Sequence, residues 1–394
     1  MPPSHMNSKK PIRLALLVDE YFGALGTAFG GYGFLARRYV AKYLPCEEIQ
    51  VDVLIRRKKS LLFAKKDLVD GVNVWHLPRY AWLARRWLKK QNYDIYLSIE
   101  LTSASARIMR LVDKSKKLIL WIQDPRPKKD WDEISTVGLL QEKSYYNQQD
   151  YDFVESLYKE NRVDFVSQGF FLNPKAIELY SLPPTVSITY LPNPVEMPAD
   201  QGVDATQFSK KNMIIFLGRI ESVKRGWLFG EIAKKMPEFE FYILGQTFRE
   251  KGENSAIMQK YSNIENLHFP GHVDGPEKES FLREAKILVN TSIHEALPVS
   301  FLEALAHGTL LVSNQNPENL TSKFGIWVGE VLGDGFDKVD LFVNAIRRIM
   351  NDESFRCEHA KAAVKYIQET HNINRFVRDM SQIVLKKARP SEKS

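Results

Sequence analysis

The stretch Lys286 to Asn314, KILVNTSIHEALPVSFLEALAHGTLLVSN, predicts a strand, a loop, a helix and a second strand in succession. Ile287 to Val289 and Leu310 to Val312 are short apolar runs containing β-branched residues, as in buried parallel strands. Between them, Pro298 stands where a helix would begin, and Gly308 can supply the left-handed residue that ends it. The pattern therefore indicates an α/β fold, whose parallel sheet would bind ligands at the carboxyl edge of its strands.

Two glutamates flank the start of this predicted helix. Glu295 lies in the loop before it, and Glu303 lies in its second turn. Between them are the free amides of the first turn, which with the helix dipole form an anion site suited to a diphosphate. Because carboxylates accept hydrogen bonds from hydroxyls, the arrangement fits a ligand with a sugar at each end, a nucleotide sugar. The spacing alone is equally compatible with an α/β unit in which Glu303 is a solvated helix residue.

Positive charge follows another predicted strand. The apolar run from Asn212 to Leu217 is followed by Gly218, Arg219 and Lys224. Arg can donate in a fork while Lys acts as a mobile point charge, so the pair suits a diphosphate. A basic surface turn is the alternative interpretation.

A glycine-rich loop follows the first predicted strand, Ile12 to Val18, and precedes a helix. Paired glycines such as Gly30 and Gly31 let the backbone approach a ligand closely. GGYG lacks the GxGxxG spacing of the dinucleotide fingerprint, and a flexible surface turn explains the loop at least as well.

The rest of the chain alternates short apolar runs with helical stretches, which favours two Rossmann-like, doubly wound parallel-sheet domains facing a cleft. We expect an N-terminal domain at 7–195 and a C-terminal domain at 196–372, with a final helix at about 373–388 packing back on the first. The two prolines in Tyr190-Leu-Pro-Asn-Pro-Val195 favour this boundary. The further runs that predict strands are Val51–Ile55, Val72–Leu77, Asp94–Ile99, Leu118–Ile122, Asp164–Ser167, Phe239–Leu244 and Asn266–Gly271.

Composition describes a globular protein of 394 residues with a formal charge of +7. No apolar run reaches the ~18 residues that a membrane-spanning helix needs, so cytosol is the expected compartment. Cys46 and Cys357 lack metal-type spacing. Lys and Arg outnumber the acidic residues between Val51 and Asn92, which suggests an anionic partner there. The sequence contains no helix-turn-helix pattern or aromatic-basic RNA motif, so we expect no nucleic acid partner.

The segment RYAWLARRWLKKQ, residues 79–91, predicts a helix with Trp82 and Trp87 among basic residues. Such a helix can lie peripherally on an anionic membrane surface. The alternative is an ordinary helix that buries its tryptophans in the core.

The polar segment from Asp124 to Glu160 contains two Asp-x-Asp pairs, at 130–132 and 150–152. Two carboxylates alone do not make a selective magnesium site, so we interpret both as surface pairs. Asp124 directly follows an apolar run and is expected at the ligand-facing end of a strand.

Two motifs together resemble the retaining glycosyltransferases of family four, which have the GT-B fold. HEALPVSFLEALAHG resembles the family's Glu-x7-Glu signature, and GRIESVKRG resembles its Gly-Arg…Lys-Gly element, although Arg225 stands before Gly226. The chain also has Thr309 where the family often has Pro, a change that should not affect the site.

The resemblance implies roles for individual residues in binding the donor, a nucleotide-diphosphate sugar. Glu295 would meet the donor sugar, Glu303 the ribose, and Arg219 with Lys224 the diphosphate. Where the family often has a His that contacts the reacting sugar, this chain has Gln123-Asp124, so Asp124 is only a candidate. The implied donor-binding set also includes Gly30 and Gly31 opposite the phosphates, Val273 at the base, and Gly218, Ala296, Leu297, Pro298, Val299 and Ser300.

The implied function is retaining glycosyl transfer from a nucleotide sugar to a hydroxyl of a glycan or lipid-linked acceptor, as in cell-surface polysaccharide synthesis. No metal is expected, because fixed cations and amides can stabilise the leaving diphosphate, and no other cofactor is implied. A GT-B nucleotide-sugar epimerase and a non-catalytic nucleotide-sugar binding protein remain alternatives.

Overall fold

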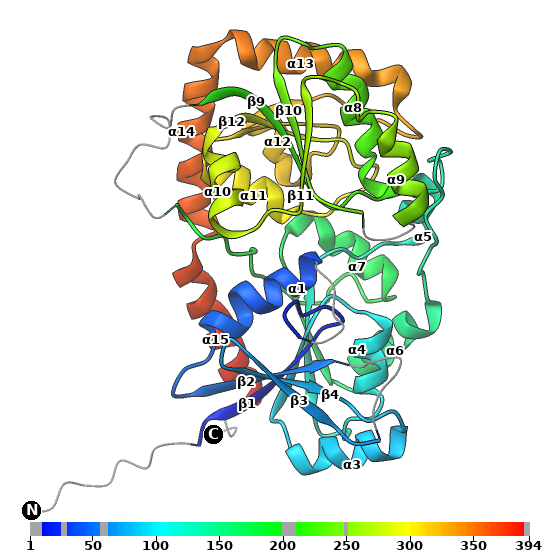
Figure 1. The fold of residues 1–394 in the computed structure, drawn as a ribbon. Coiled ribbons are helices and arrows are strands. Elements are labelled where there is room, and N and C mark those ends of the chain that lie inside the picture. The colour runs from blue at the N-terminus through cyan, green and yellow to red at the C-terminus, as the bar shows by residue number, and fades with distance from the viewer. Residues whose placement is uncertain (1–9, 25–29, 56–61, 199–209, 248–250, 390–394) are drawn as a thin grey trace, which may run out of the picture. The chain divides into compact units, whose positions relative to one another are not determined.

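The computed structural model describes residues 10–24, 30–55, 62–198, 210–247 and 251–389. The chain divides into two compact α/β units (Figure 1), which are described separately here. Unit 1 comprises residues 1–125, 147–193 and 373–394, and unit 2 comprises residues 126–146 and 194–372.

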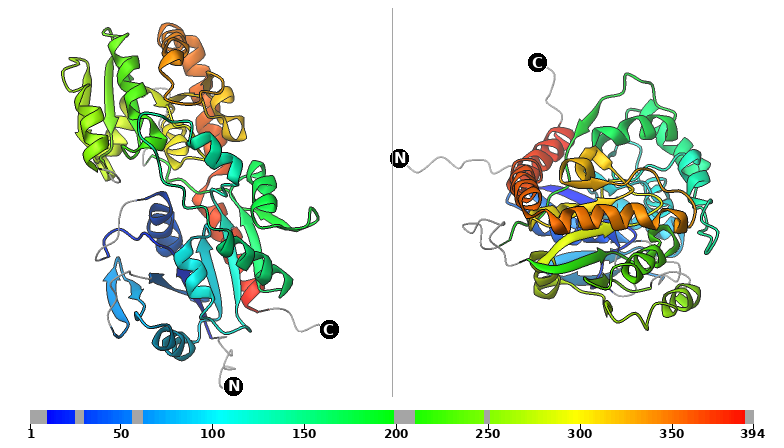
Figure 2. Two further views of the ribbon diagram at one scale, coloured as in Figure 1. Left: turned by 90° about the vertical axis from the view of Figure 1, so that its right-hand side faces the viewer. Right: turned by 90° about the horizontal axis from the view of Figure 1, so that it is seen from above.

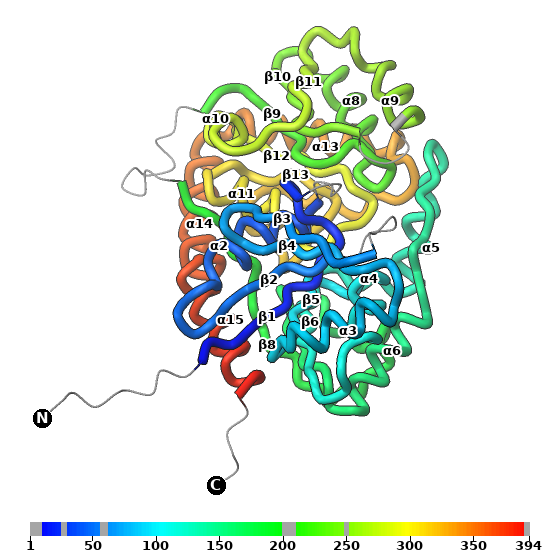
Figure 3. Tube along the Cα trace, turned by 60° about the horizontal axis from the view of Figure 1, so that its bottom comes forward, coloured from blue at the N-terminus to red at the C-terminus, as the bar shows by residue number. Residues whose placement is uncertain are grey.

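Unit 1 is built on an eight-stranded sheet with the order β3-β4-β2-β1-β5-β6-β7-β8. All neighbouring strands are parallel except β3 and β4, which form an antiparallel edge. Figure 3 shows β3, β4, β2 and β1 side by side in this order. Its elements are β1 Ile12–Leu17, α1 Gly31–Leu35, η1 Ala36–Val40, α2 Ala41–Tyr43, β2 Ile49–Ile55, β3 Lys65–Val69, β4 Val72–His76, α3 Ala81–Gln91, β5 Ile95–Ile99, α4 Ser103–Met109, β6 Lys117–Ile122, α6 Gln148–Lys159, β7 Val163–Ser167, η2 Phe170–Leu172, α7 Asn173–Leu179, β8 Ile188–Tyr190 and α15 Ile373–Ala388.

The last helix, α15, belongs to unit 1 although it follows the whole of unit 2 in sequence. Phe376 of α15 stacks on Trp121 of β6 with 5.4 Å between ring centroids. Both rings are buried, so this contact anchors the helix against the sheet.

Unit 2 is built on a six-stranded parallel sheet with the order β11-β10-β9-β12-β13-β14. The strand order reverses beside β9, as in doubly wound folds. Figure 2 shows the long helices α13 and α14 of this unit in orange and red-orange. Its elements are α5 Lys128–Ile134, β9 Lys211–Leu217, η4 Ser222–Lys224, α8 Gly226–Lys234, β10 Glu240–Leu244, α9 Lys251–Gln259, β11 Leu267–Gly271, α10 Gly275–Glu284, β12 Ala285–Asn290, α11 Val299–Ala306, β13 Leu310–Ser313, η5 Pro317–Asn319, α12 Leu320–Lys323, β14 Gly325–Trp327, η6 Phe336–Lys338, α13 Val339–Asn351 and α14 Glu353–Thr370.

Residues 126–146, which we call the crossing segment, belong to unit 2 rather than to the N-terminal domain in which the sequence analysis placed them. Trp131, Ile134 and Val137 are buried in the same core as the apolar faces of α8 and α13. The carboxylate of Asp334 also accepts hydrogen bonds from the amides of Gly138 and Leu139, at 3.0 and 2.9 Å. Burial of these apolar side chains stabilises the packing of the crossing segment in unit 2, although the chain before it belongs to unit 1.

The helix predicted at 79–91 is α3, and its two tryptophans differ. Trp87 packs against Trp75 of β4, with 5.1 Å between ring centroids, whereas Trp82 is 67% exposed. Trp87 is thus partly buried and Trp82 is exposed, so the alternative in which helix 79–91 buries both tryptophans in the core does not hold for Trp82. Within the described ranges, no helix combines the length and the apolar character needed to cross a membrane.

Candidate functional site

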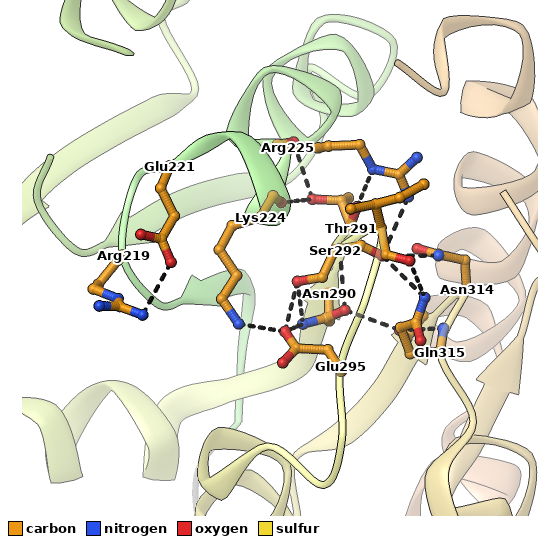
Figure 4. Close-up of polar contacts among 12 residues, drawn as sticks. Arg219, Glu221, Lys224, Arg225, Asn290, Thr291, Ser292, Glu295, Asn314 and Gln315 are labelled. Carbon is orange, nitrogen blue, oxygen red and sulfur yellow. Dashed lines mark hydrogen bonds and ion pairs between the residues drawn. The ribbon is translucent and has the colours of Figure 1, made fainter. Parts of the chain in front are cut away.

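The centre of the site is an ion pair between Lys224 and Glu295 (Figure 4), which lies in unit 2. Lys224 ends η4 in the loop after β9, and Glu295 lies in the loop after β12. Because β9 and β12 are neighbouring parallel strands, both loops leave the same carboxyl edge of the sheet. Lys224 Nζ lies 2.5 Å from Glu295 Oε1, and both side chains are largely buried.

Glu295 is held by residues of its own loop as well as by Lys224. Its Oε1 accepts hydrogen bonds from Asn290 Nδ2 at 3.0 Å and from Ser292 Oγ at 2.6 Å. Burial alone would raise the pKa of Glu295, but the charge and hydrogen bond of Lys224, with those of Ser292 and Asn290, hold that pKa below its ordinary value. Glu295 is therefore ionised, and its carboxylate is held in one orientation.

Arg219 lies two residues beyond the end of β9, where the sequence predicted it. Its Nη2 lies 3.1 Å from Glu221 Oε1, which is a buried carboxylate. Gly218 lies directly against the next loop, because a Cβ added to Gly245 would meet Gly218 O at 1.8 Å. The glycine at 245 thus permits the hydrogen bond from Gly218 N to Leu244 O.

The helix predicted after Glu295 is α11. Pro298, where the helix was predicted to begin, is its N-cap residue, so α11 starts one position later at Val299; Gly308 has the predicted left-handed conformation at φ 66°. Ala296 and Leu297 are buried and fix the loop, whereas Val299 and Ser300 of the first turn are partly exposed. No side chain caps this N-terminus, so its first amides are available to an anion.

Glu303 forms a second ion pair, with Lys278 of α10, at 2.7 Å. Both side chains are mostly buried, so Glu303 is not a solvated helix residue. Val273, the expected base contact, is buried two residues after the end of β11.

Gly30, Gly31 and Asp124 belong to unit 1, so they are described apart from the residues above. Gly30 is the residue before α1, and a Cβ there would meet Glu20 Oε2 at 1.4 Å, whereas a Cβ on Gly31 would meet nothing. Gly30 thus accommodates the Glu20 side chain. Asp124 lies two residues after β6, and its amide donates to Glu100 Oε2 at 2.6 Å.

The Asp-x-Asp pairs are not the surface pairs that the sequence analysis expected. Asp130 and Asp150 are buried, whereas Asp132 and Asp152 are exposed. Asp150 accepts hydrogen bonds from Ser103, Asn147 and Arg110, which explains its burial. Across the described residues, no group of three or more His, Cys, Asp and Glu side chains is placed to hold a metal ion.

Sequence reasoning missed several residues that shape the site. The run Asn290-Thr291-Ser292 reads only as a polar turn, yet it orients Glu295. Lys278 lies in a helix whose charge pattern is unremarkable, and its pairing with Glu303 depends on tertiary structure. Arg225 also shapes the site. The sequence signals it in one way, because Arg225 follows Lys224 where the element that the chain resembles has glycine.

Residues 203–370, which include every site residue of unit 2, match the model of the family described as Glycosyl transferases group 1. No curated protein sequence matches the chain.

Solved structures that resemble the chain over nearly its whole length have the GT-B fold, which confirms the expected fold class. Sucrose-phosphate synthase from Thermosynechococcus elongatus has a TM-score of 0.70 at 13% identity, covering 94% of this chain and 98% of that one. HepE from Anabaena, solved with UDP and glucose, has a TM-score of 0.67 at 11% identity, covering 95% and 99%. WaaG, a glycosyltransferase involved in lipopolysaccharide biosynthesis, has a TM-score of 0.64 at 13% identity, covering 94% and 99%.

Proposed function

We propose that this protein is a retaining glycosyltransferase of the family-four type, which moves a sugar from a nucleotide-diphosphate sugar to an acceptor hydroxyl. The observation that carries the proposal is the buried ion pair of Lys224 with Glu295, three residues before the uncapped N-terminus of α11. A cation, an ionised carboxylate and free helix amides thus lie together at the carboxyl edge of the unit 2 sheet.

In this proposal, the charge of the leaving diphosphate is neutralised by Arg219, Lys224 and the amides of Val299 and Ser300. These groups are fixed before reaction, so they stabilise the developing charge with little reorganisation and without a metal ion. Glu295 holds hydroxyls of the donor sugar, which is a positioning effect more than acid-base catalysis. Glu303 binds the ribose, and Val273 contacts the nucleotide base.

Support for a nucleotide donor also comes from a relative, because HepE was solved with UDP and glucose. The leaving phosphate oxygen would accept the proton of the acceptor hydroxyl, as the resemblance implies for retaining enzymes. Asp124, Gly30 and Gly31 are the candidates that unit 1 contributes to the reaction.

The donor class is tested by thermal denaturation with UDP-, GDP-, ADP- and TDP-sugars in EDTA. A ligand at 100 times its dissociation constant adds about 2.7 kcal/mol to the free energy of unfolding, which shifts the midpoint by a few degrees. We expect one nucleotide class to stabilise the wild type, and Arg219→Ala with Lys224→Ala to lose the shift. Lys234→Ala, which removes an exposed ion pair with Glu231, is the matched control and should keep it. Absence of any shift in the wild type, with or without magnesium, would contradict the proposal.

The acceptor is proposed to be a glycan or a lipid-linked hydroxyl at an anionic membrane surface. In unit 1, Trp82 of α3 is exposed beside the exposed Arg85 and Arg86. Lys66 of edge strand β3 lies over Trp75, the same ring that packs on Trp87 of α3. This combination of exposed aromatic and basic groups suits a headgroup layer. The basic residues 56–59 lie outside the described residues.

Flotation with vesicles of phosphatidylcholine and phosphatidylglycerol tests this surface. We expect the wild type to float at low salt, and Trp82→Ser with Arg85→Glu to remain at the bottom of the gradient. Phe269→Ser, which removes an exposed aromatic side chain of unit 2, should float like the wild type. Wild-type protein that does not float at low salt would remove the membrane from the proposal.

A further inference from the structure

Arg225, the residue directly after Lys224, is fully buried in unit 2, yet no carboxylate among the described residues accepts a hydrogen bond from it. Its guanidinium donates to backbone carbonyls only. Nε reaches Thr291 O at 2.6 Å and Nη2 reaches Ser292 O at 3.2 Å. Nη1 reaches Val331 O at 2.9 Å and Gly333 O at 2.8 Å. One buried cation thus joins the loop after β9, the loop after β12 and residues 331–333.

The backbone at this position would ordinarily favour glycine. Arg225 has φ 48° and ψ 50°, a left-handed conformation that L-residues with a Cβ adopt at a cost. Gly226, by contrast, begins α8 and is not among the residues with positive φ. The family's Lys-Gly element would place glycine directly after the lysine. This chain has an arginine there, and its guanidinium contacts offset the conformational cost.

Arg225 is linked to the site through both loops. On its own loop the preceding residue is Lys224, and Thr291 Oγ1 donates to Lys224 O at 2.9 Å. On the other loop, Ser292 offers its carbonyl to Arg225 and its hydroxyl to Glu295 Oε1. Figure 4 shows Arg225 on the far side of Thr291 and Ser292 from the Lys224–Glu295 pair.

We infer that Arg225 is a positioning residue, whose buried guanidinium fixes Lys224 and Glu295 in the geometry that a nucleotide-sugar donor requires. The inference rests on the proposed function, because Lys224 and Glu295 act there on the donor. Arg225 itself touches no donor atom and acts only through the two loops.

The test is Arg225→Gly, because glycine suits the left-handed backbone while the guanidinium is lost. Turnover of UDP-glucose, or of the donor that stabilises the wild type most, is measured as release of nucleoside diphosphate while the sugar is transferred to water. We expect kcat to fall at least tenfold, since small misplacements of positioning groups carry large rate costs. Guanidinium chloride at about 10 mM, far below the molar concentrations that unfold proteins, should restore part of the loss. It should restore nothing in Lys224→Met.

Controls separate positioning from simple stabilisation. Arg356→Gln removes another buried arginine of unit 2, which pairs with Glu353 on α14, and should leave kcat unchanged. If Arg225→Gly does not fold, Arg225→Lys carries the test, with an intermediate kcat and partial rescue by guanidinium expected.

Each outcome decides the inference. If the wild type is active and Arg225→Gly keeps its kcat while losing only thermal stability, the inference is wrong and the proposed function stands. A loss of kcat that guanidinium does not restore, or variants that do not fold even with guanidinium present, would make Arg225 a structural residue. If the wild type turns over no nucleotide sugar, the proposed function fails, and the inference fails with it.

Discussion

Lys224 Nζ and Glu295 Oε1 lie 2.5 Å apart, although three strands and three helices of unit 2 separate the two residues in the sequence. The pair is largely buried, so each charge depends on the other. Removing one partner of such a pair leaves the other charge buried without its counter-ion. This lowers the free energy of unfolding by about 3–5 kcal/mol when burial is complete.

Lys224→Met should therefore lower the free energy of unfolding more than the double variant Lys224→Met with Glu295→Gln. We expect at least about 1 kcal/mol of coupling in a double-mutant cycle, measured by urea denaturation at pH 7. Additive effects of the two substitutions would contradict the pairing.

The same pair predicts a pH dependence. The pKa of Glu295 is depressed below its ordinary value of 4.5, so its contribution to stability is present above pH 4.5 and is lost as the pH falls through the folded-state pKa. Wild-type protein should lose stability below pH 4.5 more steeply than Glu295→Gln. Equal slopes for the two proteins would show that Glu295 titrates normally.

Lys278 and Glu303 predict a kinetic effect of a different kind. Glu303 is proposed to bind the ribose, away from the reacting bond, so Glu303→Gln should raise the KM for the donor with little change in kcat. Loss of one charge-assisted hydrogen bond is worth about 1.5–3 kcal/mol, or roughly tenfold to 100-fold in KM. A fall in kcat at unchanged KM would place Glu303 at the reacting centre.

His307, which follows α11, predicts a second loss of stability in acid. Its Nδ1 lies 2.8 Å from Glu303 O, and its buried Nε2 has no hydrogen-bond partner among the described residues. Burial lowers the pKa of His307 from 6.5 to about 4, so its contribution is present above pH 6.5 and is lost as the pH falls through 4. The shift corresponds to about 3 kcal/mol.

His307→Asn keeps a donor near Nδ1 and removes the titrating group, so it should flatten the decline in unfolding free energy between pH 6.5 and 4. His359→Asn is the matched control, because His359 Nδ1 also contacts the carbonyl four residues earlier, Phe355 O. An unaltered decline in His307→Asn would rule out this histidine as its source.

The crossing segment predicts a local effect of Trp131→Ala. The indole is buried in the core of unit 2, and truncating such a side chain costs about 3–5 kcal/mol. Hydrogen exchange should accelerate in β9 and β12 of unit 2 but not in β1 of unit 1. Equal acceleration in both units would contradict the assignment of residues 126–146 to unit 2.

The sequence predicts the elements around the site well because their signals are local. β12, α11 and β13 start within two residues of the expected positions, and Pro298 and Gly308 mark the two ends of the helix. Apolar runs, a helix-starting proline and a left-handed glycine depend little on the rest of the fold.

Features that depend on tertiary contacts could not be predicted. Edge strand β3 carries Lys65, Lys66 and Asp67 and has no alternation of apolar and polar residues. The sequence therefore did not indicate this strand or its antiparallel pairing with β4. The crossing segment is polar apart from the few side chains that it buries. Thr309 reads as a neutral departure from proline, yet its hydroxyl can donate to either Leu282 O or Ala285 O and accepts from the partly buried Lys210.

The central claim is that Glu295 acts on the sugar of a nucleotide-sugar donor. The most direct test is release of nucleoside diphosphate from the stabilising nucleotide sugar, with water as the acceptor of the sugar, by the wild type and by Glu295→Gln in EDTA. We expect steady release by the wild type, and a kcat at least 100-fold lower in Glu295→Gln with affinity for the nucleoside diphosphate retained. Release at the wild-type rate by Glu295→Gln, or conversion of the nucleotide sugar to another one without release, would contradict the account.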